Sequence, residues 1–194
     1  MKLKTRGRRL VIAMTVSFVL LAATAYAAST LILAVGTIPH SELFDGPATV
    51  TVRTLTIGPG ETLAWHYHPG YAFNAVKSGA LTVEDGCGGE ETLTPGENSA
   101  FEELDGRVHR VKNLSTTDPV VVYNTFIMPQ GKPTTVNIPG NERRCGPPSD
   151  VDECKDGGWS QFTHPRIFND QGDCVQYVRH RPRTLIPVPE DPLN

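Results

Sequence analysis

Short runs of alternating apolar and polar residues fill the middle of the chain and predict β-strands. Residues 48–57 alternate, with Val50 and Val52 in one phase and Leu55 and Ile57 in the other. Similar runs follow at residues 62–68, 72–79, 80–86, 97–104, 107–113 and 119–128. Gly, Pro, Asn and Asp mark nearly every gap, and no run keeps a helical period. The pattern therefore predicts an antiparallel sandwich or a small barrel.

The N-terminal segment breaks this pattern and reads as a targeting segment. Residues 1–9 carry five basic residues and no acidic one, residues 10–36 carry no charge, and residues 25–27 (AYA) offer a cleavage site. We expect a signal peptide over residues 1–27, because residues 29–38 suit a first strand. The alternative is an uncleaved membrane anchor through residues 10–36, which exceed the ~20 apolar residues that span a bilayer. Both readings place the protein outside the cytoplasm, either secreted or anchored to the membrane.

The C-terminal third differs from both regions in composition. Proline and polar residues dominate from residue 129 onward, so we expect the barrel to occupy residues 28–129 and a Pro-rich linker or surface wrap to occupy residues 130–150. Residues 151–180 form a cysteine-bracketed module, expected to be a small disulfide-held hairpin or helix turn with Trp159 as its apolar anchor. Residues 181–194 are read as a tail.

Four cysteines support export. They are Cys87, Cys145, Cys154 and Cys174, an even set in a chain expected to be exported, which favours two disulfides. Three pairings can be drawn. We favour Cys154 with Cys174, both inside the C-terminal module, which leaves Cys87 with Cys145.

Length and charge limit the class of protein. A chain of 194 residues accommodates one ordinary domain with an appendage. Removing residues 1–27 leaves 13 basic residues against 21 acidic ones, a net charge of −8. Nucleic acid is therefore not an expected partner, because phosphate binding requires a clustered basic surface.

Two closely spaced histidines carry the candidate chemistry. His66 and His68 lie two residues apart on a predicted strand, so their side chains project from the same face. His109 lies on another predicted strand and can supply a third imidazole. Three nitrogen ligands suit a divalent transition metal, whose open positions would take water, dioxygen or substrate.

The spacing of these residues resembles the two motifs of the cupin superfamily over residues 47–129. The matching positions are Gly60, His66, His68 and Gly79 in the first motif and Gly106, His109 and Asn113 in the second. Three positions depart from the motifs. Ala72 stands where the first motif has glutamate, Leu104 where the second has proline, and Asn98 where the second has its opening glycine.

This resemblance implies an all-β fold, a double-stranded β-helix or jelly-roll barrel, with a metal at its mouth on residues matching His66, His68 and His109. The chain is especially similar to exported bacterial cupins with a WHxHPG core. Some cupins without the glutamate, among them thiol dioxygenases, bind iron through three histidines, so Ala72 does not exclude a metal. We expect iron first, with nickel, copper or zinc as alternatives to the harder manganese. A homodimer is a further expectation from the family.

Two functions are compatible with these residues. The first is a non-haem metal-dependent dioxygenase or isomerase acting on a small polar molecule. The second is a non-catalytic barrel that binds a sugar or small acid without metal. Catalytic residues stay unassigned, because strand phase does not say which polar side chains of the barrel point inward. Those considered as an acid or base are Tyr67, Glu84, Glu102, Arg110 and Tyr123.

Overall fold

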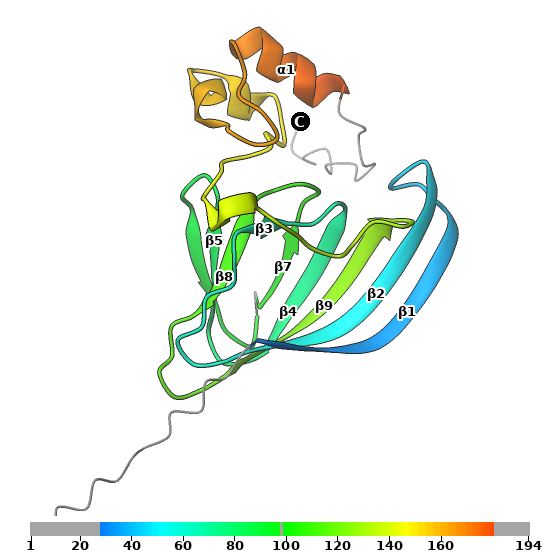
Figure 1. The fold of residues 1–194 in the computed structure, drawn as a ribbon, viewed down its shortest axis with the longest axis vertical. Helices are drawn as coiled ribbons and strands as arrows, with labels where there is room; N and C mark the ends of the chain where they lie inside the picture. Colours follow the sequence, from blue (N-terminus) through cyan, green and yellow to red (C-terminus); the bar gives the residue numbers. More distant parts are fainter. Residues whose placement is uncertain (1–27, 98, 181–194) are drawn as a thin grey trace, which may run out of the picture.

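The computed structural model describes residues 28–97 and 99–180. Its centre is a barrel of two five-stranded sheets, and every pair of neighbouring strands is antiparallel (Figure 1). The strands of the first sheet are, in order, β1 (Ser29–Ser41), β2 (Gly46–Ile57), β9 (Val120–Pro129), β4 (Tyr71–Ser78) and β7 (Ala100–Glu103). Those of the second are β10 (Val136–Asn137), β3 (His66–Tyr67), β8 (His109–Asn113), β5 (Leu81–Asp85) and β6 (Glu90–Leu93). The expected all-β barrel is confirmed.

Most of the expected strands form, and the differences have local causes. The run 62–68 shortens to β3 and an isolated bridge between Thr62 and Lys112. Strand β6 was not predicted, because three of its four side chains are exposed and leave no apolar alternation in the sequence. Strand β10 is only two residues long and forms by pairing with β3.

One apolar cluster fills part of the barrel interior. Its buried members are Leu55, Ile57, Val76, Leu81, Leu93, Val111, Val120 and Val122. This cluster explains why the apolar alternation along β2 changes phase. Leu55 and Ile57 point into the cluster, whereas Val50 and Val52 are half-buried on the opposite face. Burial of this cluster is the main driving force for closing the barrel.

The N-terminal strand forms where the sequence predicts it. Strand β1 covers the expected run 29–38 and pairs with β2, but apolar side chains along it, such as Leu31 and Val35, stay exposed. The predicted signal peptide or anchor helix over residues 1–27 lies outside the described residues. No described helix combines the length and apolarity that a bilayer span requires.

Residues 130–150 run along the barrel and make specific contacts with it. Strand β10 adds to the second sheet, and Asn141, at the end of the 3₁₀ turn η1 (Pro139–Asn141), accepts a hydrogen bond from the Trp65 backbone at 2.8 Å. The Cys87–Cys145 disulfide then ties this segment to the loop after β5. The segment is therefore a surface wrap and not a free linker.

The C-terminal module is helical and packs around its own disulfide. It consists of the 3₁₀ turns η2 (Asp152–Cys154) and η3 (Gly158–Gln161) and the helix α1 (Gln171–His180), at the top of Figure 1. Cys154 pairs with Cys174, so both expected disulfides are confirmed. Trp159 packs against the module core as a partly buried residue, and the centre of that core is formed by Phe162 and Phe168, which are fully buried.

Candidate metal centre

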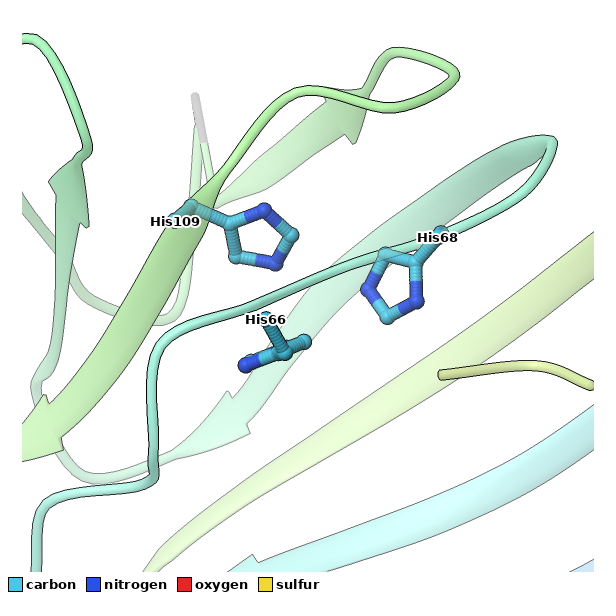
Figure 2. Close-up of side chains that lie close together, drawn as sticks. All are labelled: His66, His68 and His109. Carbon is cyan, nitrogen blue, oxygen red and sulfur yellow. The ribbon is translucent and has the colours of Figure 1, made fainter. Parts of the chain in front are cut away.

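Three histidines meet on the inner face of the second sheet. His66 lies on β3 and is the direct cross-strand partner of His109 on β8, while His68 follows the end of β3. All three side chains are buried. Their imidazole rings surround a common space, with ring centroids 4.4 to 5.2 Å apart (Figure 2).

Two glycines hold the loops that carry this cluster. Gly106, at a positive φ of 75°, donates its backbone N–H to the carbonyl of His68 at 2.8 Å and so joins the two histidine segments. Gly70 turns the chain after His68 against β9, where a Cβ atom would clash with the carbonyl oxygen of Ile127. Any larger residue there would push the His68 segment off the barrel.

Backbone carbonyls fix the orientation of every imidazole. The Nδ1 atom of His66 lies 2.7 Å from the Ala64 carbonyl oxygen, and that of His109 lies 3.0 Å from the Arg107 carbonyl oxygen. The Nδ1 atom of His68 is paired in the same way with Thr134, on the wrap. A carbonyl only accepts, so each Nδ1 carries a proton, and any ring without a second proton presents its Nε2 lone pair to the common space.

The three ligand atoms are gathered closely enough for one metal ion. One nitrogen of each ring lies within 4.8 Å of the others. Nitrogens bound at about 2.0–2.1 Å to one metal lie roughly 3.0–3.5 Å apart, so small side-chain rotations close the set. In addition, Nε2 of His109 is the one buried side-chain nitrogen or oxygen of the described residues without a hydrogen bond of acceptable geometry, and its one close polar neighbour is a carboxylate. An imidazole nitrogen that faces a carboxylate in this way is suited to bind a cation between the two.

A carboxylate completes the cluster, although the sequence motif lacks one. Glu103, on β7, lies with Oε1 2.9 Å from Nε2 of His109 and Oε2 3.1 Å from Nε2 of His68. The β4–β7 register places it directly opposite Ala72, the position where the motif has glutamate. Residues opposite each other in an antiparallel pair share a face, so Glu103 occupies from the neighbouring strand the space that a glutamate at 72 would fill.

The family model of the cupin domain matches residues 53–127. This stretch contains all three histidines and Glu103 and extends from within β2 to within β9. The chain contains a cupin domain. The match does not extend to the cysteine-bracketed module.

Solved structures are similar to part of the chain at low sequence identity. A cupin superfamily protein from Desulfitobacterium hafniense is 11% identical, with 53% of this chain and 79% of that chain covered and a TM-score of 0.41. For a Klebsiella pneumoniae protein with a double-stranded β-helix domain, the identity is 19%, the coverage 57% and 83%, and the TM-score 0.41. The polyketide cyclase RemF from Streptomyces resistomycificus is 17% identical, with coverage of 46% and 60% and a TM-score of 0.40. No curated protein matches the sequence.

Burial and charge set the protonation of the cupin site. Burial, together with the charges of His109 and His68, lowers the pKa of His66 to about 3, so this ring is neutral at physiological pH. Burial also acts to lower the pKa of His109, but the adjacent Glu103 carboxylate outweighs it and raises the pKa. Burial would raise the pKa of Glu103, yet His109 and His68 hold it well below its usual value. Without an ion, a proton on His109 therefore balances Glu103.

Five polar residues were candidates for an acid or base in the barrel. In the described part of the chain, none of them lines the pocket. Tyr67 packs against His164, and Glu84 pairs with Arg110, whose guanidinium also lies over Trp65. The other two, Glu102 and Tyr123, are exposed.

Sequence reasoning missed Glu103, the neighbour of one of those residues. The alternation in β7 contained a signal, because Phe101 and Glu103 share one face and Phe101 is the apolar residue expected inside.

Proposed function

We propose that this cupin binds a divalent transition metal through His66, His68 and His109, with Glu103 as the carboxylate ligand in place of the residue missing at Ala72. The observation that carries the proposal is the convergence of three oriented Nε2 lone pairs and a carboxylate on one buried point. All four groups accept hydrogen bonds, so in the neutral-histidine state they repel one another unless a cation lies between them.

The spacing of the carboxylate supports coordination. Two neighbouring ligand atoms of an octahedral metal, each at about 2.1 Å from it, are about 3.0 Å apart. The two contacts of Glu103 with histidine nitrogens, 2.9 and 3.1 Å, match that separation. Three imidazoles and one carboxylate suit iron(II) first, with nickel, copper and zinc as alternatives.

We infer an oxygenase or isomerase reaction on a small polar molecule. A bound metal would supply a Lewis acid with open positions for substrate or dioxygen. The chain itself keeps the rings oriented through Ala64, Thr134 and Arg107 and holds Glu103 by a hydrogen bond from Asn74 at 3.0 Å. Leu55, Leu63 and other apolar residues line the rest of the pocket and restrict water there.

Export is part of the proposal. The two disulfides favour an oxidising, extracytoplasmic compartment, because such bonds are rare in reducing cytosol. Intact-mass analysis of protein recovered from the native cell envelope and medium tests this. A mass that corresponds to a chain beginning near Ala28 indicates cleavage of the signal peptide. Full-length protein in the membrane fraction indicates an uncleaved anchor.

Metal analysis of the untagged protein tests the metal site. We expect stoichiometric metal in the wild-type chain and its loss in a His66→Ala, His109→Ala double variant. His40→Ala is the matched control, because His40 is exposed on β1, away from the pocket. Trace metal that does not fall further in the double variant would disprove the metal site.

A metal-free binding barrel is the second candidate function. It is favoured by the direct contacts of Glu103 with His68 and His109, which satisfy the cluster through a proton and need no ion. In that case the protein contains no stoichiometric metal, and small molecules bind equally well before and after treatment with a chelator.

A further inference from the structure

A half-buried arginine shares the pocket with the histidines. Arg53 projects from β2 into the barrel and lines the same pocket as His66 and His68. Its guanidinium lies 4.5 Å from the centroid of the Phe126 ring, whose own neighbour is the imidazole of His68 at 5.0 Å between centroids. One phenyl ring therefore separates the cation from the histidine cluster.

This cation has no anionic partner among the described residues. Only Nε of Arg53 is used, as a donor to Oδ1 of Asn124 at 3.1 Å, and no described carboxylate lies within ion-pair distance. The guanidinium carbon lies over the face of the Phe126 ring, and no described group accepts a hydrogen bond from either terminal nitrogen of Arg53. Burial lowers the pKa of Arg53, although Glu103 acts in the opposite direction. Keeping the guanidinium charged in this pocket therefore costs desolvation free energy.

A row of amides keeps Arg53 apart from Glu103. Asn124 donates to Asn74 at 2.7 Å, and Asn74 donates to Glu103 at 3.0 Å. The strand register reinforces this order, because Arg53 is opposite Asn124 and Asn124 is opposite Asn74. The row therefore fixes the guanidinium and keeps it from pairing with Glu103, the one carboxylate among the described residues that line the pocket.

The remaining lining restricts the size and polarity of a ligand. The apolar lining residues other than Phe126 are Leu55, Leu63, Leu81, Phe101, Val111 and Val122. The cavity volume is only about 30 Å³, and the cavity opens to solvent. Only a short ligand with one charged end suits this combination of small size, apolar wall and fixed cation.

We propose that Arg53 anchors the carboxylate of the natural ligand and that this ligand is a small aliphatic carboxylic acid whose other end faces the histidine cluster. This step rests on the proposed function. With a divalent ion on the histidines, the ion, Glu103 and Arg53 together carry a net charge of +2 in a mostly buried site, which selects an anion. A guanidinium binds a carboxylate through two parallel N–H···O bonds, the geometry that its free in-plane N–H groups offer.

Butanoate and its uncharged isostere butanamide are the probes of this subsite. Their dissociation constants are measured by calorimetry or ligand-observed NMR on the full chain, both with its metal and after chelation. We expect butanoate to bind at least about 10-fold more tightly than butanamide in both forms. Arg53→Gln removes this preference, with butanoate binding about 10- to 100-fold weaker, and Arg53→Lys retains part of it. Arg110→Gln is the matched control, because Arg110 is paired with Glu84 outside the pocket.

The outcomes separate this proposal from the metal site. If the preference exists only in the metal-loaded form and survives Arg53→Gln, the carboxylate binds the metal and the role of Arg53 is disproved. Equal binding of the two probes, or no binding of butanoate, also disproves it. If the chain holds no metal, the chelated samples still decide the role of Arg53, since the preference there depends on the guanidinium alone.

Discussion

The interior of the barrel has two layers, which the same strands build with opposite chemistry. On each of five strands, one inward-facing residue is polar and the inward-facing residue two positions away is apolar. The pairs are Arg53 and Leu55 on β2, Asn74 and Val76 on β4, Glu103 and Phe101 on β7, His109 and Val111 on β8, and Asn124 and Val122 on β9. Residues i and i+2 share a face, so one short step along each strand separates the site from the core.

The two layers are held together by different forces. The apolar layer packs side chain against side chain, with Ile57 and Val120 fully buried. In the polar layer, hydrogen bonds join groups such as Asn74 and Asn124 into a row, and the histidine rings are held by backbone carbonyls. A substitution in the apolar layer should therefore change the stability of the fold and leave binding at the polar layer largely intact. A substitution in the polar layer should change binding and leave the core packing largely intact.

The largest expected effect is the loss of core packing in the apolar layer. Ile57→Ala should lower the free energy of unfolding by about 2–5 kcal/mol, because it leaves a cavity at a fully buried position. Metal affinity of the folded variant should stay within a few fold, since Ile57 does not line the pocket. Urea unfolding and metal titration measure the two quantities. Ile167→Ala is the control, because Ile167 is 72% exposed. Loss of metal affinity equal to the loss of stability would show that the layers are coupled.

A smaller effect is expected from the carboxylate of the polar layer. Glu103→Gln should weaken metal binding about 10- to 100-fold, because it removes a charged ligand while keeping its shape. The neighbouring Glu102→Gln is the control, because Glu102 is exposed. A chelator competition assay measures both.

A strand swap gives the sharper version of this test. Ala72→Glu combined with Glu103→Ala should recover part of the affinity that Glu103→Ala loses, since the two positions are opposite each other on one face. If the swap recovers nothing, a carboxylate at that point in the barrel does not bind the metal.

Most of the fold could be read from the sequence because the barrel strands alternate strongly. The runs around Leu55 and Val122 consist mostly of apolar and β-branched residues, and the spacing of His66, His68 and His109 predicted their shared location. The pairing of Cys154 with Cys174 followed from their closeness within one small unit.

The carboxylate and the arginine could not be read in the same way. Glu103 meets the histidines only because β7 pairs with β4 in one particular register, and sequence alone does not fix register between strands thirty residues apart. Arg53 lies on a strand whose apolar alternation changes phase at Thr54, so the sequence pattern does not fix its direction, and only the burial of Leu55 on the same face places it inside. The pairing of strands distant in the sequence, and not the local residue pattern, places Glu103 and Arg53 in the pocket.

The smallest effect is expected on the outer face of the barrel. Glu84 lies on β5, three residues after the core residue Leu81, and pairs with Arg110 and Lys112. Burial acts to raise its pKa, but hydrogen bonds from those two residues outweigh it and hold the pKa below its usual value. Its contribution to stability is therefore present above the unfolded pKa and disappears as the pH falls through the folded pKa. Glu84→Gln should cost less than about 1 kcal/mol at neutral pH, and the difference from wild type should vanish in acid. Urea unfolding across this pH range checks the prediction, and a cost that grows toward acid would contradict it.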